Sequence, residues 1–161
     1  VYHRIVSRRS PSAFGFVDHD LFPVRDVRVM DYLDGQPFYG PLRRRGTEGC
    51  WYLSAIMSFY DMQWVRSHGG IDYMPVTPYN DYMDSGGGNW YRLYSKVDAD
   101  SCRFPDEEIV PLRDGGDRHG DSLEYFDGRR WLHTINGSCW KRVADGKDSM
   151  VRTLLEDILK K

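Results

Sequence analysis

The cysteines are the first residues to test for chemistry, because a thiolate can bind a metal ion or attack a substrate. The 161-residue chain has three of them, at positions 50, 102 and 139. Structural metal sites use closely spaced ligands, and the sequence has neither a Cys-x-x-Cys nor a His-x-x-x-His pair. The glycine triplet at 86–88 also lacks the Lys-Ser/Thr of a phosphate loop. We therefore predict no metal site and no cofactor. The odd number of cysteines favours a reducing, intracellular compartment.

Arginines stand beside aromatic residues at several points, a pattern typical of surfaces for nucleic acid or acidic peptides. The longest run is Arg43-Arg44-Arg45, and further basic pairs lie at 8–9, 129–130 and 141–142. The net charge is nevertheless −2, from 22 basic and 24 acidic residues. Proteins whose main function is to bind nucleic acid usually have more basic than acidic residues. A solvated rim is therefore the favoured interpretation, and nucleic acid is a possible but not a favoured partner.

Three short motifs follow one another in the middle of the chain. They are Gly49-Cys50-Trp51-Tyr52-Leu53-Ser54-Ala55-Ile56, then Tyr91-Arg92-Leu93-Tyr94, and finally Glu108-Ile109-Val110-Pro111-Leu112. They resemble the second, third and closing strands of a Tudor-like reader domain of the royal family, with residues 35–43 as the first strand. The resemblance covers residues 35–112, about half of the chain, and each motif is short.

The resemblance implies a site that holds a methylated ammonium group between aromatic rings, with a carboxylate nearby. Tyr52 and Tyr94 match the walls of such a cage, and Asp98 or Asp100 matches the polar residue at its rim. The alternative is that both tyrosines pack the core of a small barrel, as aromatic residues in strands usually do.

Two features depart from the family pattern. Where many Tudor domains have an aromatic residue at the end of the first strand, this chain has Leu42 and then the three arginines, while Phe38 and Tyr39 are near but out of position. The insertion at 67–88 is also longer than the usual turn. If the cage is incomplete, the domain has the Tudor-like fold but does not bind methylated side chains.

Gly49-Cys50-Trp51 also resembles the nucleophile segment of papain-like and calpain-like proteases. This second resemblance implies that Cys50 is a nucleophile and that His133, or else His119, is its partner. The chain is shorter than those proteases, and it lacks their glutamine-containing segment before the cysteine. A buried thiol is the plainer interpretation of Cys50, so we do not predict an enzyme.

Strands must position these residues. Residues 27–33 predict a strand that ends at an Asp34-Gly35 hairpin turn, with residues 36–42 returning from it. Residues 51–58 alternate in a way that favours a strand over a helix, and residues 89–97 alternate likewise. The glycines and prolines of residues 67–88 predict a long irregular loop.

The C-terminal part predicts a three-stranded meander at 123–126, 129–135 and 138–143, joined by two Asx-Gly turns. A final helix is expected over 149–159, since its apolar residues recur at helical spacing. The predicted fold class is mainly β: a small bent antiparallel barrel or sheet, with this meander and one C-terminal helix. We divide it into 1–34 (N-terminal arm and first strands), 35–112 (Tudor-like barrel region) and 122–161 (meander plus helix), all in one globular unit.

Composition places the chain among globular proteins. Hydrophobic residues make up 40% and charged residues 29%, which excludes a disordered tail, a collagen-like repeat and a coiled coil. No apolar run reaches the roughly 18 residues that a membrane span needs. Because the first residue is Val1, we expect a trimmed or processed N-terminus, in a nuclear or organellar protein.

We expect a non-catalytic binding or scaffold module that recognises a methylated-lysine, methylated-arginine or other peptide segment within a larger complex. One alternative is an accessory structural subunit of an organellar or nuclear assembly, with no ligand of its own. In this alternative the loop 67–88 and the N-terminal arm wrap around neighbouring subunits. Tyr73, Tyr79, Tyr82 and Trp90 favour it, because they lie in or beside a segment too rich in Pro and Gly to form its own core. The second alternative is a cysteine hydrolase that uses Cys50 and His133.

Overall fold

The computed structural model describes residues 11–45, 49–78, 82–112 and 122–135, together with 149, 151–153, 155–156 and 160. These residues form a mainly β structure with antiparallel sheets, as predicted. The strands belong to three separate sheets and do not close into a barrel. The elements in chain order are β1 (Ala13–Val17), β2 (Leu21–Pro23), α2 (Val29–Tyr32), β3 (Phe38–Tyr39), β4 (Leu42–Arg45), β5 (Cys50–Leu53), β6 (Met57–Asp61), α3 (Met62–Ser67), α4 (Asn89–Arg92), η3 (Tyr94–Lys96), η4 (Ala99–Ser101), β7 (Glu107–Pro111), β8 (Ser122–Phe126) and β9 (Trp131–His133).

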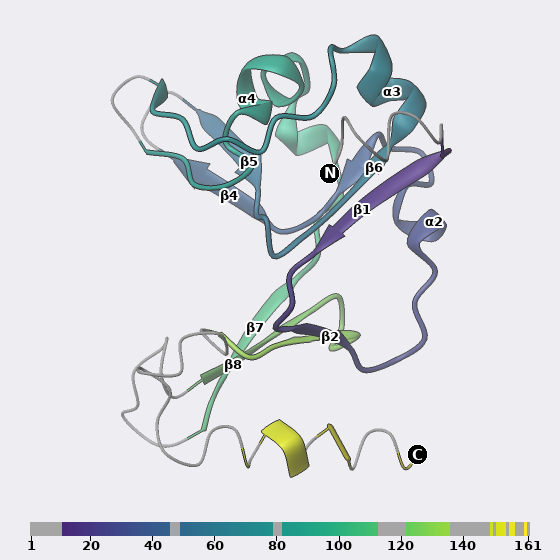
Figure 1. Cartoon of the computed structure of the whole chain (residues 1–161), viewed down its shortest axis with the longest axis vertical. Coiled ribbons are helices and arrows are strands. Elements are labelled where there is room, and N and C mark those ends of the chain that lie inside the picture. Colours follow the sequence, from purple (N-terminus) through teal and green to yellow (C-terminus); the bar gives the residue numbers. More distant parts are fainter. Residues whose placement is uncertain are drawn as a thin grey trace. The chain divides into compact units, whose positions relative to one another are not determined.

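The chain divides into two compact units. Within the described residues, unit 1 comprises 11–18 and 28–104, and unit 2 comprises 19–27 and 105 onward. The chain leaves unit 1 after β1, contributes β2 to unit 2 and returns to unit 1 at α2 (Figure 1). Strand pairing explains why this division differs from the predicted one: β2 pairs with β9, and β7 pairs with β8.

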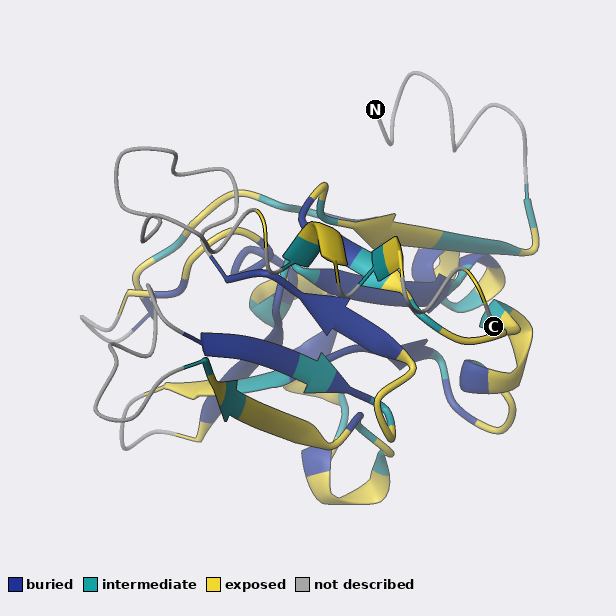
Figure 2. Cartoon of the chain, turned by 90° about the horizontal axis from the view of Figure 1, so that it is seen from below, coloured by how far each residue is buried: buried dark blue, intermediate teal, exposed yellow. Residues whose placement is uncertain are grey.

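Unit 1 contains a three-stranded sheet in the order β1-β6-β3 and a two-stranded sheet of β4 and β5. All four residues of β5 are buried, whereas β1 is largely exposed. The sheet of unit 2 shows the same contrast in Figure 2, where β8 is mostly dark blue and β7 mostly yellow. A sharp turn at Gly40 separates β3 from β4. A Cβ atom there would lie 2.3 Å from the Met57 carbonyl oxygen, so the turn requires glycine.

Unit 2 contains a four-stranded antiparallel sheet in the order β2-β9-β8-β7. The predicted hairpin between β8 and β9 is confirmed, but its loop spans residues 127–130 instead of the predicted two residues, and Asp127, Gly128 and Arg129 all have positive φ. The third strand predicted for the meander, 138–143, lies outside the described residues, and β9 pairs with β2 on its other side. Within the expected C-terminal helix, residues 149, 151–153 and 155–156 are helical.

Two strand predictions were wrong. Residues 29–32 form α2, followed by a turn at Gly35, where φ is +73°. Residues 89–96 form α4 and η3, and the first amides of α4 bond to glycine carbonyls, from Asn89 to Gly86 and from Trp90 to Gly87. The segment that would supply the third strand of the Tudor resemblance is therefore helical. The strand preferred over a helix at 51–58 is confirmed as β5 and the start of β6, with a turn between them.

The predicted long loop is more ordered than its composition suggests. Its first residue, Ser67, belongs to α3, and Val76 and Met83 form an antiparallel bridge further along. Ile71 and Met83 are both buried in the hydrophobic core of unit 1. The segment thus contributes to that core.

Candidate functional site

The two tyrosines predicted to form a cage lie in the core of unit 1. Tyr52, on β5, is 3% exposed, and Tyr94, on η3, is 0% exposed. The Tyr94 ring stacks on Trp51 with centroids 4.7 Å apart and meets the edge of Phe38 at 5.4 Å. In this conformation neither tyrosine presents an open ring face to a ligand.

Hydroxyl groups connect this core internally. The Tyr60 and Tyr94 hydroxyls lie 2.7 Å apart, and the same distance separates Ser58 Oγ from the Tyr73 hydroxyl. Burial raises the pKa of all three phenols above the ordinary value, so they remain neutral hydrogen-bonding groups at neutral pH. These bonds join β6 to η3 and to the segment that contains Tyr73.

The remaining cage candidates have local structural partners. Phe38 is fully buried, and Tyr39 stacks on Tyr32 at 4.4 Å. Asp98 caps η4, where its Oδ1 accepts a hydrogen bond from the Asp100 amide at 3.0 Å. The exposed Asp100 carboxylate accepts a 2.9 Å hydrogen bond from an arginine of β4.

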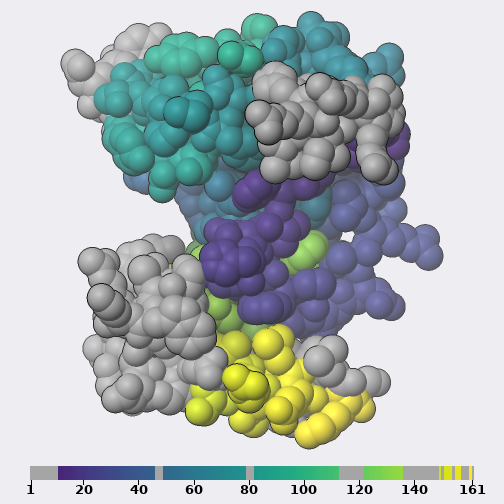
Figure 3. Space-filling model, in the orientation of Figure 1, coloured from purple at the N-terminus to yellow at the C-terminus, as the bar shows by residue number. Residues whose placement is uncertain are grey.

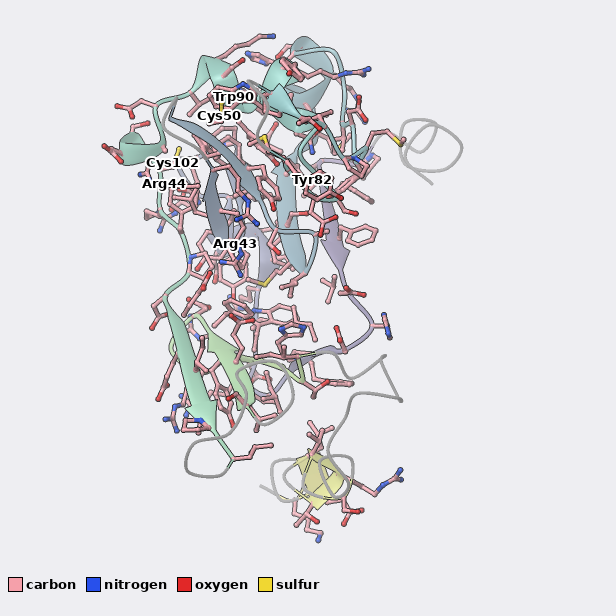
Figure 4. All side chains as sticks on the ribbon, turned by 90° about the vertical axis from the view of Figure 1, so that its left-hand side faces the viewer. Arg43, Arg44, Cys50, Tyr82, Trp90 and Cys102 are labelled. Carbon is pink, nitrogen blue, oxygen red and sulfur yellow. The ribbon has the colours of Figure 1, made fainter. Side chains whose placement is uncertain are left out.

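The three consecutive arginines do not form one patch. They occupy β4, where Arg43 pairs with Tyr52, Arg44 with Trp51 and Arg45 with Cys50. Because neighbouring strand residues point to opposite faces, Arg44 faces away from the other two. Figure 4 shows Arg44 close to Cys102 and apart from Arg43, and it is Arg44 that pairs with Asp100.

The second basic pair within the described residues, Arg129-Arg130, is engaged in ion pairs. Arg129 forms two hydrogen bonds to the Glu108 carboxylate, and its guanidinium lies 5.2 Å from the centre of the Tyr125 ring. Arg130 pairs with Asp127 at 3.4 Å. Both arginines therefore contribute to the exposed rim of unit 2, as the solvated-rim interpretation expects.

An exposed aromatic surface lies on unit 1 and includes two of the tyrosines that the sequence analysis placed in or beside the loop 67–88. Four side chains form what we call the aromatic patch: Phe16, Tyr73, Met74 and Tyr82. Phe16 is 39%, Met74 67% and Tyr82 56% exposed. The rings of Phe16 and Tyr73 lie 5.1 Å apart, which joins β1 to a segment far along the chain. Figure 3 shows the purple atoms of the β1 region beside the teal atoms of the later segment.

Backbone pairing brings the segment of Tyr82 beside that of Tyr73. Val76 and Met83 form an antiparallel bridge, and the Gly86 amide donates to the Tyr73 carbonyl at 3.2 Å. A Cβ atom added to Gly86 would lie 3.9 Å from both the Tyr52 ring and the Tyr73 ring, so this pairing adjoins β5.

Aspartates border each segment of the aromatic patch. Asp18 follows the end of β1, Asp72 precedes Tyr73, and Asp84 follows Tyr82 by two residues. The Tyr82 hydroxyl lies 3.4 Å from the Asp84 carboxylate, and Asp72 pairs with Arg92 at 3.4 Å. Asp84 therefore places a negative charge beside Tyr82, whereas the charge of Asp72 is paired with that of Arg92.

The two residues of the hydrolase alternative belong to different units. Cys50 is buried at the first position of β5, so it begins a strand and not a helix. His133 lies in β9 of unit 2, where both of its ring nitrogens face carboxylates. His119 and Cys139 lie outside the described residues.

The carboxylates facing His133 form a buried charged cluster with it. His133 Nδ1 lies 2.9 Å from Glu124 Oε2, and His133 Nε2 lies 3.4 Å from Asp20 Oδ1. The three side chains are only 5–10% exposed. Burial alone would lower the pKa of His133, but the bonds and charges of the two carboxylates raise it to about 9. His133 is therefore an imidazolium at neutral pH.

Only one group among the described residues brings three potential metal ligands together. The donor atoms of the consecutive Asp18, His19 and Asp20 lie within 4.8 Å of one another. Asp20 already faces the His133 imidazolium, and acidic runs are common without an ion, so we do not assign these residues as metal ligands.

Two shallow cavities of unit 1 adjoin α3 and share Asp61 and Gln63. The larger, about 500 Å³, is open to solvent and lies between α3 and residues 33–37. The smaller, about 420 Å³, is bordered by Pro11, Ser12 and Arg66. Asp61 is already engaged as the N-cap of α3, accepting a 2.7 Å hydrogen bond from the Trp64 amide. Neither cavity brings together an acid–base pair.

In the described part of the chain, none of the helices has the length and apolar character that crossing a membrane requires. Comparison of the sequence with protein-family models and curated proteins, and of the chain with solved structures, finds no match.

Proposed function

We propose that the chain is a non-catalytic binding module whose aromatic patch recognises a basic peptide segment of a partner protein, with methylated lysine or arginine as its specific target. The observation that carries this proposal is the contact between the Phe16 and Tyr73 rings, which brings β1 beside a segment that also has the exposed Met74 and Tyr82. The partner belongs to a larger complex.

The chemistry of the patch favours a cation. The faces of aromatic rings attract ammonium and guanidinium groups, and methylation favours this contact because it weakens hydrogen bonding to water. Tyr82 supplies an exposed ring with the Asp84 carboxylate beside it. Met74 adds a flexible apolar surface of the kind that adapts to peptide side chains. An acidic peptide or nucleic acid would instead meet repulsion from the aspartates.

This proposal keeps the ligand class implied by the Tudor resemblance but places it on a different surface. Tyr94 is fully buried, so binding there would require the core of unit 1 to open. Tyr82 and Phe16 need no such opening. In this proposal, Tyr52 is a core residue beneath the patch and does not contact the ligand.

The proposal is tested with an array of lysine- and arginine-containing peptides, each unmodified and methylated, and with calorimetry on the intact chain. We expect Tyr82→Ala and Phe16→Ala to weaken binding of the best peptide about tenfold or more, since each removes a ring from the surface. Tyr91→Ala is the matched control, because Tyr91 is also a tyrosine, 57% exposed, but belongs to α4.

Two results would overturn the proposal. The first is an array in which no basic peptide binds more tightly than millimolar. The second is a peptide whose affinity falls equally in the Tyr91→Ala control. Binding that is instead lost on Arg43→Ala and is specific for acidic peptides would favour the arginines of β4 as the binding surface.

A further inference from the structure

The buried charged cluster of unit 2 has no part in the proposed function. Asp20 comes from the short segment 19–27, while Glu124 and His133 come from β8 and β9 near the other end of the chain. Two carboxylates and one imidazolium occupy a site that is at least nine-tenths buried. Burying a charge is unfavourable in free energy unless an opposite charge pairs with it. The proton on His133 therefore decides whether the two carboxylates have a positive partner.

The neighbours of His133 can be given for the described residues of unit 2. On the paired strands, His133 lies opposite Glu124 of β8 and Leu21 of β2, and the residue opposite Glu124 on β7 is Ile109. The Phe126 ring stacks near the imidazole at 6.4 Å.

Beyond these contacts, His19 is close enough to affect Asp20, and its charge lowers the pKa of that carboxyl in addition to the larger effect of His133. Glu108 and Tyr125 are paired strand residues that point to the opposite face of the sheet, and Arg129 of the hairpin loop interacts with both of them there. Among the described residues, Asp20 and Glu124 are thus the groups whose charges act on His133.

Asp20 also connects to the sheet through its backbone. The Thr134 amide donates to the Asp20 carbonyl at 3.0 Å, and the Val24 amide donates to the Arg130 carbonyl at 2.9 Å. Between these two bonds lie the three paired residues of β2 and β9. Because β2 is so short, it forms few backbone hydrogen bonds to β9. The buried charged cluster therefore contributes a large part of the interactions that hold residues 19–27 on the sheet.

We propose that protonated His133 acts as a clasp that holds residues 19–27 on the sheet of unit 2, and that loss of its proton releases this segment. Without that proton, two buried carboxylates face a neutral ring, and Asp20 Oδ1 has no hydrogen-bond partner in the described part of the chain besides its 3.4 Å ion pair with His133. Release lets Asp20 return to water, which relieves the unbalanced charge.

The direction of the pH dependence follows from the two shifts. His133 has a pKa of about 9 in the folded protein against an ordinary 6.5, so its contribution is complete below about pH 6.5 and is lost as the pH rises to about 9. Asp20 has a lowered pKa, so its contribution is present above its ordinary value of 3.8 and is lost as the pH falls below that. The clasp is closed at mildly acidic pH and loosens across the neutral to alkaline range.

The test is NMR on the intact chain with ¹⁵N labelling. We expect both His133 ring nitrogens to carry protons at pH 7 and to titrate near pH 9. Between pH 7 and 9, hydrogen-exchange protection of the Val24 and Thr134 amides should fall by up to tenfold per pH unit, after correction for intrinsic exchange. Amides between β7 and β8 should keep their protection.

Variants separate the clasp from general destabilisation. Glu124→Gln and Asp20→Asn each remove one charge with little change in shape, and each should lower the pH at which His133 titrates. His68→Gln, in unit 1, is the matched control and should leave the exchange of Val24 unchanged. If a variant fails to fold, the titration of the unmodified chain still decides. Titration of His133 at or below pH 6.5, or protection of Val24 that does not depend on pH, would overturn the proposal.

Discussion

The tyrosines of unit 1 have two different roles: some pack in the core, and others lie on the surface. Tyr94 is fully buried with its hydroxyl bonded to Tyr60, whereas Tyr82 is more than half exposed. Both appear in the sequence as aromatic residues near glycines and aspartates. The difference arises because Tyr94 begins a short helix that packs on Trp51, while Tyr82 precedes the bridge between Val76 and Met83. Composition indicated an aromatic surface without indicating which rings form it.

The thiol of Cys50 provides a direct test of the enzyme alternative. We expect iodoacetamide to label Cys102, which is partly exposed, much faster than the buried Cys50 in the folded protein. Mass spectrometry of peptides after timed labelling measures both rates at once. Labelling in denaturant is the control, since there the two thiols should react alike. Fast labelling of folded Cys50 that slows in His133→Ala would contradict the binding-module proposal and favour the hydrolase.

The sequence predicted the hairpin that carries Glu124 and His133, but neither its register nor the position of Asp20. A two-residue turn at Asp127-Gly128 would place Glu124 opposite Trp131, whereas the observed loop spans residues 127–130 and places Glu124 opposite His133. Alternation along Leu123–Phe126 also places Glu124 on the face opposite to Leu123 and Tyr125. The position of Asp20 depends on β2 pairing with a strand more than a hundred residues away, for which the sequence contains no local signal.

At the scale of elements, local turn chemistry allowed the correct predictions, and short alternating runs caused the errors. The hairpin of β8 and β9 and the strand at β5 were recognisable from an Asx-Gly turn and from leading aromatic residues. Over residues 89–97, alternation fitted a strand, but burial of Asn89, Leu93 and Tyr94 follows helical spacing. Runs of seven to nine residues are too short for periodicity to separate these cases.

The junction of β6 and α3 depends on a single side chain. Asp61 ends the strand and caps the helix that follows at once, and its Oδ1 accepts the Trp64 amide at 2.7 Å. We expect Asp61→Ala to lower the free energy of unfolding by about 1 kcal/mol, since it leaves a first-turn amide without its acceptor. Gln63→Ala, at an exposed position of the same helix, should change it by less than about 0.5 kcal/mol. Urea denaturation of the three proteins measures both effects, and equal losses would contradict the capping role.

On the scale of the whole molecule, the chain interleaves its two units, because residues 19–27 interrupt unit 1 to join the sheet of unit 2. The residue composition along the chain does not predict this division, because residues 19–27 form a short segment whose composition does not differ from that of its neighbours. The two units also differ in the chemistry of the site that each contains. The aromatic patch lies on unit 1, and the buried charged cluster belongs to unit 2.

The two units should therefore differ in how their stability responds to pH. Within the described residues, the ion pairs of unit 1 are at least partly exposed, while unit 2 has a buried imidazolium whose pKa is about 9. From pH 6.5 to 8.5 we expect unit 2 to lose about 2 kcal/mol of stability and unit 1 to change little. Hydrogen exchange with mass spectrometry, analysed separately for peptides of each unit in increasing urea, measures the two values in one sample. His133→Gln should remove the pH dependence of unit 2, because the titrating group is gone. A loss of stability shared equally by peptides of both units would show that they unfold together and would contradict this prediction.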